Sequence, residues 1–198
     1  MTRRENSSKR RKAFREPRTL ILIVSAKKTE PAYFSGLNRH LANPAYKLTV
    51  VGRHEDPSRL VRFASKYGSG FNHVWCVADV DEFDIAATTK LAHTSNVSLA
   101  VSNPCFEYWL LLHFEHCRAP MKRCGEDVTP RLRKHLPSYE KQDLDFGDFA
   151  EKLDDALRRA KRQCADFGGE YLTNPSTGVW ALVELLMRAS AQSDNPER

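Results

Sequence analysis

Four short apolar runs, separated by segments of helical spacing, constrain the fold of this chain most strongly. The runs occupy residues 19–24, 47–52, 73–79 and 96–102. Continuous apolar runs with many β-branched residues are typical of strands that are buried on both faces of a parallel sheet. The helices predicted between them span about residues 31–42, 58–67 and 83–93. Strands that alternate with helices predict an α/β domain in which parallel strands are joined by right-handed crossovers.

The second half of the chain is predicted to be mainly helical. We expect a helix over 105–115, irregular chain or short helices over 118–146, a helix over 148–167 and a last helix after Asn174. These predictions divide the chain into a disordered basic arm, an α/β core and a helical elaboration packed on that core. Their bounds are residues 1–17, 18–115 and 116–198.

The positive charge of the chain is concentrated at its N-terminus. The 198 residues carry a formal net charge of +6, and residues 1–18 hold eight Lys or Arg against two Glu. Arg10, Arg11 and Lys12 lie in the densest part of this arm. A basic, polar segment of this kind is predicted to be disordered and can contact nucleic-acid phosphates, although it can equally act as a solubility tail.

Neither a membrane span nor a disulfide framework is expected. No apolar run approaches the roughly 20 residues that cross a bilayer, so we expect a cytoplasmic protein that does not enter a membrane. The five cysteines are odd in number and include no C-x-x-C, so packed thiols are expected at Cys105, Cys117 and Cys124. His113 and His116 do not complete a standard zinc-finger spacing with them.

The third predicted strand ends in two carboxylates that are two residues apart. Asp79 and Asp81 follow the apolar run over 74–78, and side chains two residues apart in extended chain point to the same side. Because the two carboxylates repel each other, the pair is costly unless a cation such as Mg²⁺ or Mn²⁺ binds there. The alternative is an Asp that merely ends the strand and caps the next helix.

Further polar side chains follow the other strands. Lys27, Lys28 and Glu30 come after the first strand, Arg53 after the second and Glu107 after the fourth. Because ligands bind beyond the carboxyl ends of the strands in open parallel sheets, these side chains are expected to share one crevice. Carboxylates for an ion, with Lys27, Lys28 and Arg53 to neutralise phosphate, suit metal-assisted cleavage of a phosphodiester. The alternatives are that the glutamates only complement helix N-termini and that the lysines are ordinary exposed loop residues.

Other common chemistries lack their motifs in this chain. It has no G-x-G-x-x-G after a strand, no G-x-x-x-x-G-K-[ST] and no G-x-S-x-G, which argues against a dinucleotide site, a P-loop and a hydrolase elbow. An aspartyl-phosphate phosphatase would carry its nucleophile after the first strand, where this chain has Ser25. Phosphodiester chemistry with a divalent ion therefore stays the preferred prediction.

Several segments resemble the RloB-like family. They are Thr-Glu-Pro-Ala-Tyr-Phe at 29–34, Val-Ala-Asp-Val-Asp at 77–81, the segment beginning Ser-Asn-Pro-Cys-Phe-Glu at 102–114, and Asn-Pro-Ser-Thr-Gly-Val-Trp at 174–180. The resemblance covers nearly the whole chain. It implies a Toprim-type domain, the Mg²⁺-binding module of topoisomerases, primases and OLD-family nucleases. It also implies a place in bacterial restriction-linked or abortive-infection loci against phage, often beside an ATPase partner.

The resemblance breaks down at one functional position. Toprim domains, and RloB-like proteins with them, place a Glu, usually followed by Gly, directly after the first strand, whereas this chain has Ser25 and Ala26. A serine hydroxyl is a weak, neutral ligand and cannot replace a carboxylate. Either Glu30 or Glu107 supplies the third carboxylate, or the chain has lost hydrolysis and keeps only binding.

We therefore expect a Toprim-like, Rossmann-like parallel sheet of about four strands flanked by helices, with a C-terminal helical elaboration. The expected function is Mg²⁺- or Mn²⁺-dependent cleavage of DNA or RNA in anti-phage defence. Asp79 and Asp81 would hold the ion, and Glu30 or Glu107 would complete the site or position water. The alternative is a catalytically inert nucleic-acid-binding or regulatory subunit that works with an ATPase. Assembly into a homo-oligomer stays open.

Overall fold

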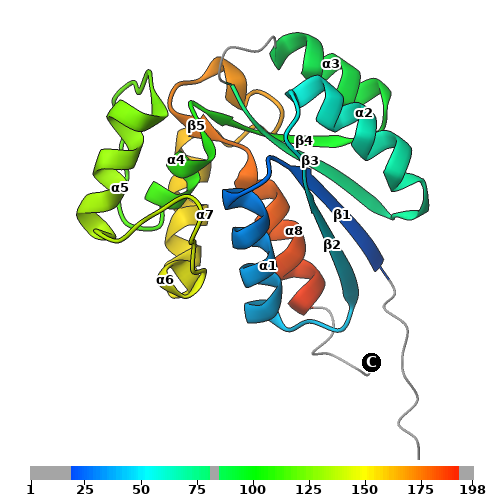
Figure 1. Cartoon of the computed structure of the whole chain (residues 1–198), viewed down its shortest axis with the longest axis horizontal. Helices are drawn as coiled ribbons and strands as arrows, with labels where there is room; N and C mark the ends of the chain where they lie inside the picture. Colours follow the sequence, from blue (N-terminus) through cyan, green and yellow to red (C-terminus); the bar gives the residue numbers. More distant parts are fainter. Residues whose placement is uncertain (1–18, 81–84, 192–198) are drawn as a thin grey trace, which may run out of the picture.

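The strands form one sheet at the centre of the molecule (Figure 1). The computed structural model describes residues 19–80 and 85–191, without the side chains of the last three. The strands are β1 (Thr19–Ser25), β2 (Tyr46–Gly52), β3 (His73–Asp79), β4 (Ser98–Asn103) and β5 (Ser176–Thr177). Their order is β2-β1-β3-β4-β5, with the first four parallel and β5 antiparallel to β4. The predicted α/β class and parallel sheet are confirmed, with a fifth, two-residue strand added.

The helices between the strands agree with the predicted ones. The α-helices are α1 (Thr29–Leu41), α2 (Pro57–Tyr67), α3 (Ile85–Thr94), α4 (Phe106–Leu111), α5 (Thr129–His135), α6 (Gly147–Ala150), α7 (Leu153–Gln163) and α8 (Val179–Ala191). Three short turns of other helix types are η1 (Gly68–Gly70), η2 (Cys124–Val128) and η3 (Glu170–Leu172). Local chemistry explains where α2 begins, because the Asp56 side chain accepts the Arg59 backbone N–H at 2.9 Å and Pro57 needs no hydrogen-bond partner.

Two predicted helices differ from the structure. The helix expected over 105–115 covers only α4, and the one expected over 148–167 is split into α6 and α7 and ends at Gln163. Phe167 does not continue the apolar face of α7, because its ring packs instead against Trp75 and Trp180, with centroids 5.3 and 6.5 Å away. The apolar spacing therefore did not mark one continuous helix, and Phe167 at its end stays 41 % exposed.

Helices cover both faces of the sheet. Alternate residues of β1 divide between two apolar clusters: Ile21 and Ile23 join one, and Leu22 and Val24 the other. The second cluster lies under α2 and α3, while α1, α4, α7 and α8 cover the first (Figure 1). This arrangement buries the central strands on both sides, as their continuous apolar runs predicted.

Residues 116–172 form the helical segment that lies beside α1 and α4 (Figure 1). Tyr33 of α1 connects it to the core, because its ring contacts Phe106, Phe146 and Phe149 and its hydroxyl lies 3.2 Å from His113 Nε2. After this segment the chain returns to the sheet as β5 and α8. The segment is therefore held firmly against the end of the sheet where β1 leads into α1.

A disulfide joins Cys105, just before α4, to Cys124 at the start of η2. The expectation of packed thiols at these two positions was therefore wrong, while Cys117 is a buried free thiol. The two partners are 19 residues apart in the sequence and meet only because η2 folds back on α4. No spacing rule could have paired them.

Within residues 19–80 and 85–191, no helix combines the length and the apolar character that a bilayer span requires.

Candidate metal centre

A cavity of about 430 Å³ opens at the carboxyl ends of the parallel strands. Its walls come from the loop after β1, the end of β3, the start of α4 and the loop between α5 and α6. The chain passes from β1 to β2 on one side and then to β3 on the other, so the strand order reverses between β1 and β3. Ligands bind at such reversal points in open α/β sheets.

Three carboxylates from three different strand ends line this cavity. Glu30 lies in the first turn of α1, Asp79 is the last residue of β3, and Glu107 lies in the first turn of α4. Glu30 is 5 % exposed, Glu107 is 2 % exposed, and Asp79 is half-buried. The structure thus brings together three of the four acids that the sequence singled out. The fourth, Asp81, lies outside the described residues.

Glu30 has a strongly raised pKa. Burial, reinforced by the neighbouring charge of Glu107, raises the pKa of Glu30 from 4.5 to about 7, although a backbone hydrogen bond and Lys141 act in the opposite direction. A carboxyl group with such a pKa exchanges its proton near neutral pH, which is the property of a general base. A cation placed beside it would relieve the repulsion from Glu107.

Lys141 brings a cation into the cavity that sequence reasoning missed. Its Nζ lies 2.7 Å from Glu107 Oε1, and the Tyr139 hydroxyl donates to the same oxygen at 3.4 Å. Burial lowers the pKa of Lys141, but the charges of Glu107, Asp79 and Glu30 together raise it above its usual value. Lys141 is thus a fixed positive charge that neutralises part of the acidic cluster.

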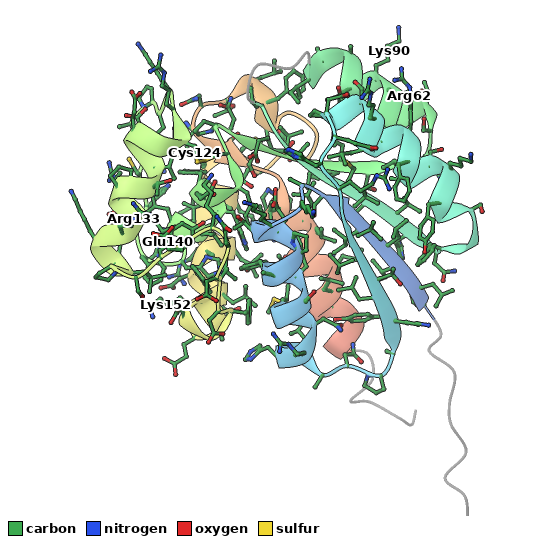
Figure 2. The ribbon with its side chains drawn as sticks, in the orientation of Figure 1. Arg62, Lys90, Cys124, Arg133, Glu140 and Lys152 are labelled. Atoms are coloured by element: carbon green, nitrogen blue, oxygen red, sulfur yellow. A yellow bond between two sulfur atoms is a disulfide. The ribbon has the colours of Figure 1, made fainter. Side chains whose placement is uncertain are left out.

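The loop that carries Lys141 is anchored from both sides. The Arg133 guanidinium pairs with Glu140 at 2.8 Å and also donates to the Tyr139 carbonyl at 3.2 Å, while the Thr29 hydroxyl donates to the Lys141 carbonyl at 3.3 Å. Arg133 and Glu140 are both labelled on the helical segment in Figure 2. No local pattern predicts this arrangement, because Lys141 is 34 positions from Glu107 in an irregular stretch.

Only some of the residues predicted to bind phosphate line the cavity. Lys27 and Lys28 are exposed and line the cavity, as does His54. Gly52 lets the Lys27 loop lie close to β2, because a Cβ at Gly52 would be only 3.1 Å from Lys27 Cα. Arg53 does not line the cavity: it pairs with Glu55 at 2.7 Å and lies over the ring of Phe63.

The remaining positions that the sequence singled out are three residues of the basic arm and Ser25. Arg10, Arg11 and Lys12 of the basic arm lie outside the described residues. Ser25, where the family resemblance led us to expect a glutamate, is fully buried at the end of β1 and donates from its hydroxyl to the Ala26 carbonyl at 3.1 Å. A serine held in this way offers no charge to an ion, so among the described residues the acids that can join Asp79 in this cavity are Glu30 and Glu107.

The cavity offers the ligand chemistry of a hard divalent cation, but the oxygens of Glu30, Asp79 and Glu107 do not all lie within 4.8 Å of one another, so the side chains would have to move closer to share an ion. Glu30, Asp79 and Glu107 offer carboxylate oxygens, which are the ligands that Mg²⁺ and Mn²⁺ prefer. Burial is the main reason that the pKa of Glu30 is raised, and repulsion from Glu107, which an ion would relieve, adds to it. Lys141 counts against the fit, because it pairs with Glu107 and its charge also acts on Asp79 and Glu30, although its side chain is half-exposed.

Comparison with protein-family models matches residues 20–186 to the family described as RloB-like protein. The searches of curated proteins and of solved structures each found no match. The matched range contains every residue that lines the cavity.

Proposed function

The chain belongs to the RloB-like family, and from this membership and its acidic cavity we propose that it is a Toprim-type, Mg²⁺- or Mn²⁺-dependent nuclease. The observation that carries the proposal is the convergence of Glu30, Asp79 and Glu107 from three strand ends into one cavity that also holds lysines. Carboxylates for an ion beside cations for phosphate are the combination that phosphodiester cleavage needs.

The acids divide into two roles. Asp79 and Glu107 would hold the ion, together with Asp81 as the sequence predicts, and a bound Mg²⁺ would supply charge stabilisation on the phosphate oxygens. Glu30 would accept a proton from the attacking water, because its pKa of about 7 lets it act as a base at neutral pH.

The lysines would bind the substrate. Lys27 and Lys28 are exposed on the rim of the cavity, where they can reach the phosphates of a nucleic acid. Lys141 points at the carboxylates from the other side and would stabilise the negative charge that develops on the phosphate. The basic arm would add affinity without sequence preference.

The proposed biological setting follows from the family resemblance. We infer a role in bacterial defence against phage, in which an ATPase encoded nearby controls the nuclease. DNA and RNA are both suitable substrates, because the proposed contacts reach only phosphates.

One alternative has a structural argument of its own. Ser25 removes the acid that Toprim domains place after β1, and Lys141 already neutralises Glu107. A cavity in this state could bind nucleic acid without cleaving it, which would make the chain a regulatory subunit of an ATPase-containing complex.

A cleavage assay on single- and double-stranded DNA and RNA separates the two proposals. With Mg²⁺ or Mn²⁺, the wild type should cleave at least one substrate, and Asp79→Asn should lower the rate by about 100-fold or more. The matched control is Asp143→Asn, which makes the same chemical change at an exposed position in the Lys141 loop and should leave the rate unchanged. If wild type and Asp79→Asn are equally inactive even with the partner ATPase, the binding subunit is the correct account.

A further inference from the structure

The disulfide lies against one of the cavity acids. Cys105 precedes α4 by one residue and is 2 % exposed, whereas Cys124 is only half-buried. Cys124 Sγ lies 2.9 Å from Glu107 Oε2, the oxygen that does not face Lys141. Figure 2 labels Cys124 where η2 approaches α4. Two sulfurs and a carboxylate oxygen therefore share one small, largely buried space.

We propose that the reduced Cys105–Cys124 pair forms, with Glu107, a site for a thiophilic divalent cation such as Zn²⁺, and that the disulfide closes this site. This inference goes beyond the proposed nuclease function and does not need it. It concerns a different class of metal, because thiolates select Zn²⁺ over Mg²⁺.

The positions of the three side chains suit such an ion. One ligand atom from each of Cys105, Glu107 and Cys124 lies within 4.8 Å of the other two, and in the described part of the chain no other group of His, Cys, Asp and Glu does so. Zn–S bonds of about 2.3 Å in a tetrahedral site place two sulfurs about 3.8 Å apart. The disulfide sulfurs must separate to reach that distance.

The chain around Cys124 can make this adjustment. Cys105 is fixed at the start of a buried helix, but the residues directly before Cys124 are irregular and exposed. The Cα atoms of the two cysteines are 5.9 Å apart, so rotation of the two side chains is enough to separate the sulfurs. Three protein ligands then leave a fourth position for water.

The metal site forms only after the Cys105–Cys124 disulfide is reduced, and a dithiol can act as the reductant. A dithiol donates two electrons and two protons to the disulfide and is itself oxidised to a disulfide, which leaves thiols at Cys105 and Cys124. Zn²⁺ then displaces both thiol protons into solvent as it binds the two thiolates. Reductant reaches the pair through Cys124, the more exposed of the two sulfurs.

Cobalt and zinc titrations of the full chain test this inference. The oxidised protein should show three free thiols after denaturation and the reduced protein five, since the other three cysteines are unpaired. Reduced wild type should bind one Co²⁺ with a thiolate-to-cobalt charge-transfer band, and Zn²⁺ should displace it. The oxidised protein should show no band.

Variants identify the ligands. Cys124→Ser should abolish the charge-transfer band or weaken binding by at least about tenfold, because a hydroxyl is a poor ligand at neutral pH. Glu107→Gln should weaken binding, and Cys164→Ser, which alters a free cysteine outside the cluster, should bind like wild type. The comparison of oxidised with reduced wild type does not depend on whether any variant folds.

Equal Co²⁺ binding by reduced wild type and Cys124→Ser, or by the oxidised and reduced protein, would overturn the inference and leave the disulfide as a cross-link only. None of these readouts depends on cleavage, so failure of the nuclease proposal would not be mistaken for failure of this one.

Discussion

At neutral pH the carboxyl group of Glu30 is close to half-protonated, because burial and the neighbouring Glu107 raise its pKa to about 7. The folded protein therefore binds a proton at Glu30 more tightly than the unfolded chain does. The stabilisation that this proton provides is fully present below pH 4.5 and is lost as the pH rises through 7. In the absence of metal, an ionised Glu30 is a cost to folding at alkaline pH.

Glu30→Gln should remove this cost. At pH 8 with a chelator, the variant should have a free energy of unfolding higher than wild type by roughly 1–3 kcal/mol, and the difference should disappear toward pH 5. Urea unfolding at both pH values measures it, with Glu140→Gln as an exposed control. A variant that is less stable than wild type at pH 8 would show that the ionised Glu30 is well stabilised without an ion.

Residues at strand ends were the part of the site that the sequence could predict. Glu30, Asp79 and Glu107 each follow an apolar run, and the carboxyl ends of parallel strands lie at one edge of the sheet. Lys141 reaches the cavity, and the Cys124 sulfur reaches Glu107, from a distant segment through tertiary packing. That contact depends on how the helical segment folds back, which no local pattern records.

At the scale of elements, the loop between α5 and α6 forms one wall of the cavity. It holds Lys141 against Glu107 through the contacts of Arg133 and Thr29. A metal ion and the Lys141 ammonium group compete for the same negative charge, whereas a phosphate and the metal do not. Metal binding and substrate turnover should therefore respond in opposite directions when Lys141 loses its charge.

Lys141→Met should tighten Mn²⁺ binding by roughly three- to tenfold, a modest effect because the side chain is half-exposed, while slowing cleavage. Lys134→Met, an exposed lysine on α5, is the matched control and should change neither quantity. Calorimetric titration and the cleavage assay report the two effects separately. Weaker Mn²⁺ binding in Lys141→Met would mean that Lys141 organises the carboxylates and does not compete with the ion.

The predictability of the elements follows from how each is stabilised. Strands β1, β3 and β4 are buried on both faces and the edge strand β2 is partly buried, so their sequences are apolar runs that can be recognised directly. Strand β5 has only two residues and exists because β4 pairs with it. The break between α6 and α7 likewise depends on packing, since the apolar spacing continues across it.

At the scale of the whole molecule, the net charge and the cavity lie in different parts of the chain. The body is close to neutral, and the excess of basic residues is in the first 18 residues. Binding to polyanions should then depend on salt mainly through the arm, because each phosphate contact releases counterions. Cleavage chemistry should depend on the body.

Replacing Arg10, Arg11 and Lys12 by Gln should test this separation. If all three contact phosphates, the slope of log K against log salt for nucleic-acid binding should fall in magnitude by about 2 to 3. Lys66→Gln, an exposed lysine at the end of α2, should leave the slope unchanged. An unaltered slope in the triple variant would make the arm a solubility tail.

The sequence also predicted that helices cover both faces of the sheet, because parallel strands are joined by crossovers that place helices on its faces. The distances between the acids at the strand ends could not be predicted in this way, because they depend on side-chain packing.

Calorimetric titration of the oxidised full-length protein with Mn²⁺ at pH 8 tests the central claim most directly, because the disulfide then keeps the cysteine sulfurs out of the competition. Wild type and Asp143→Asn should bind Mn²⁺ with the same affinity, and Asp79→Asn should bind at least about tenfold more weakly. Equal affinity of Asp79→Asn and wild type, or no binding by wild type, would contradict a metal centre at the end of β3.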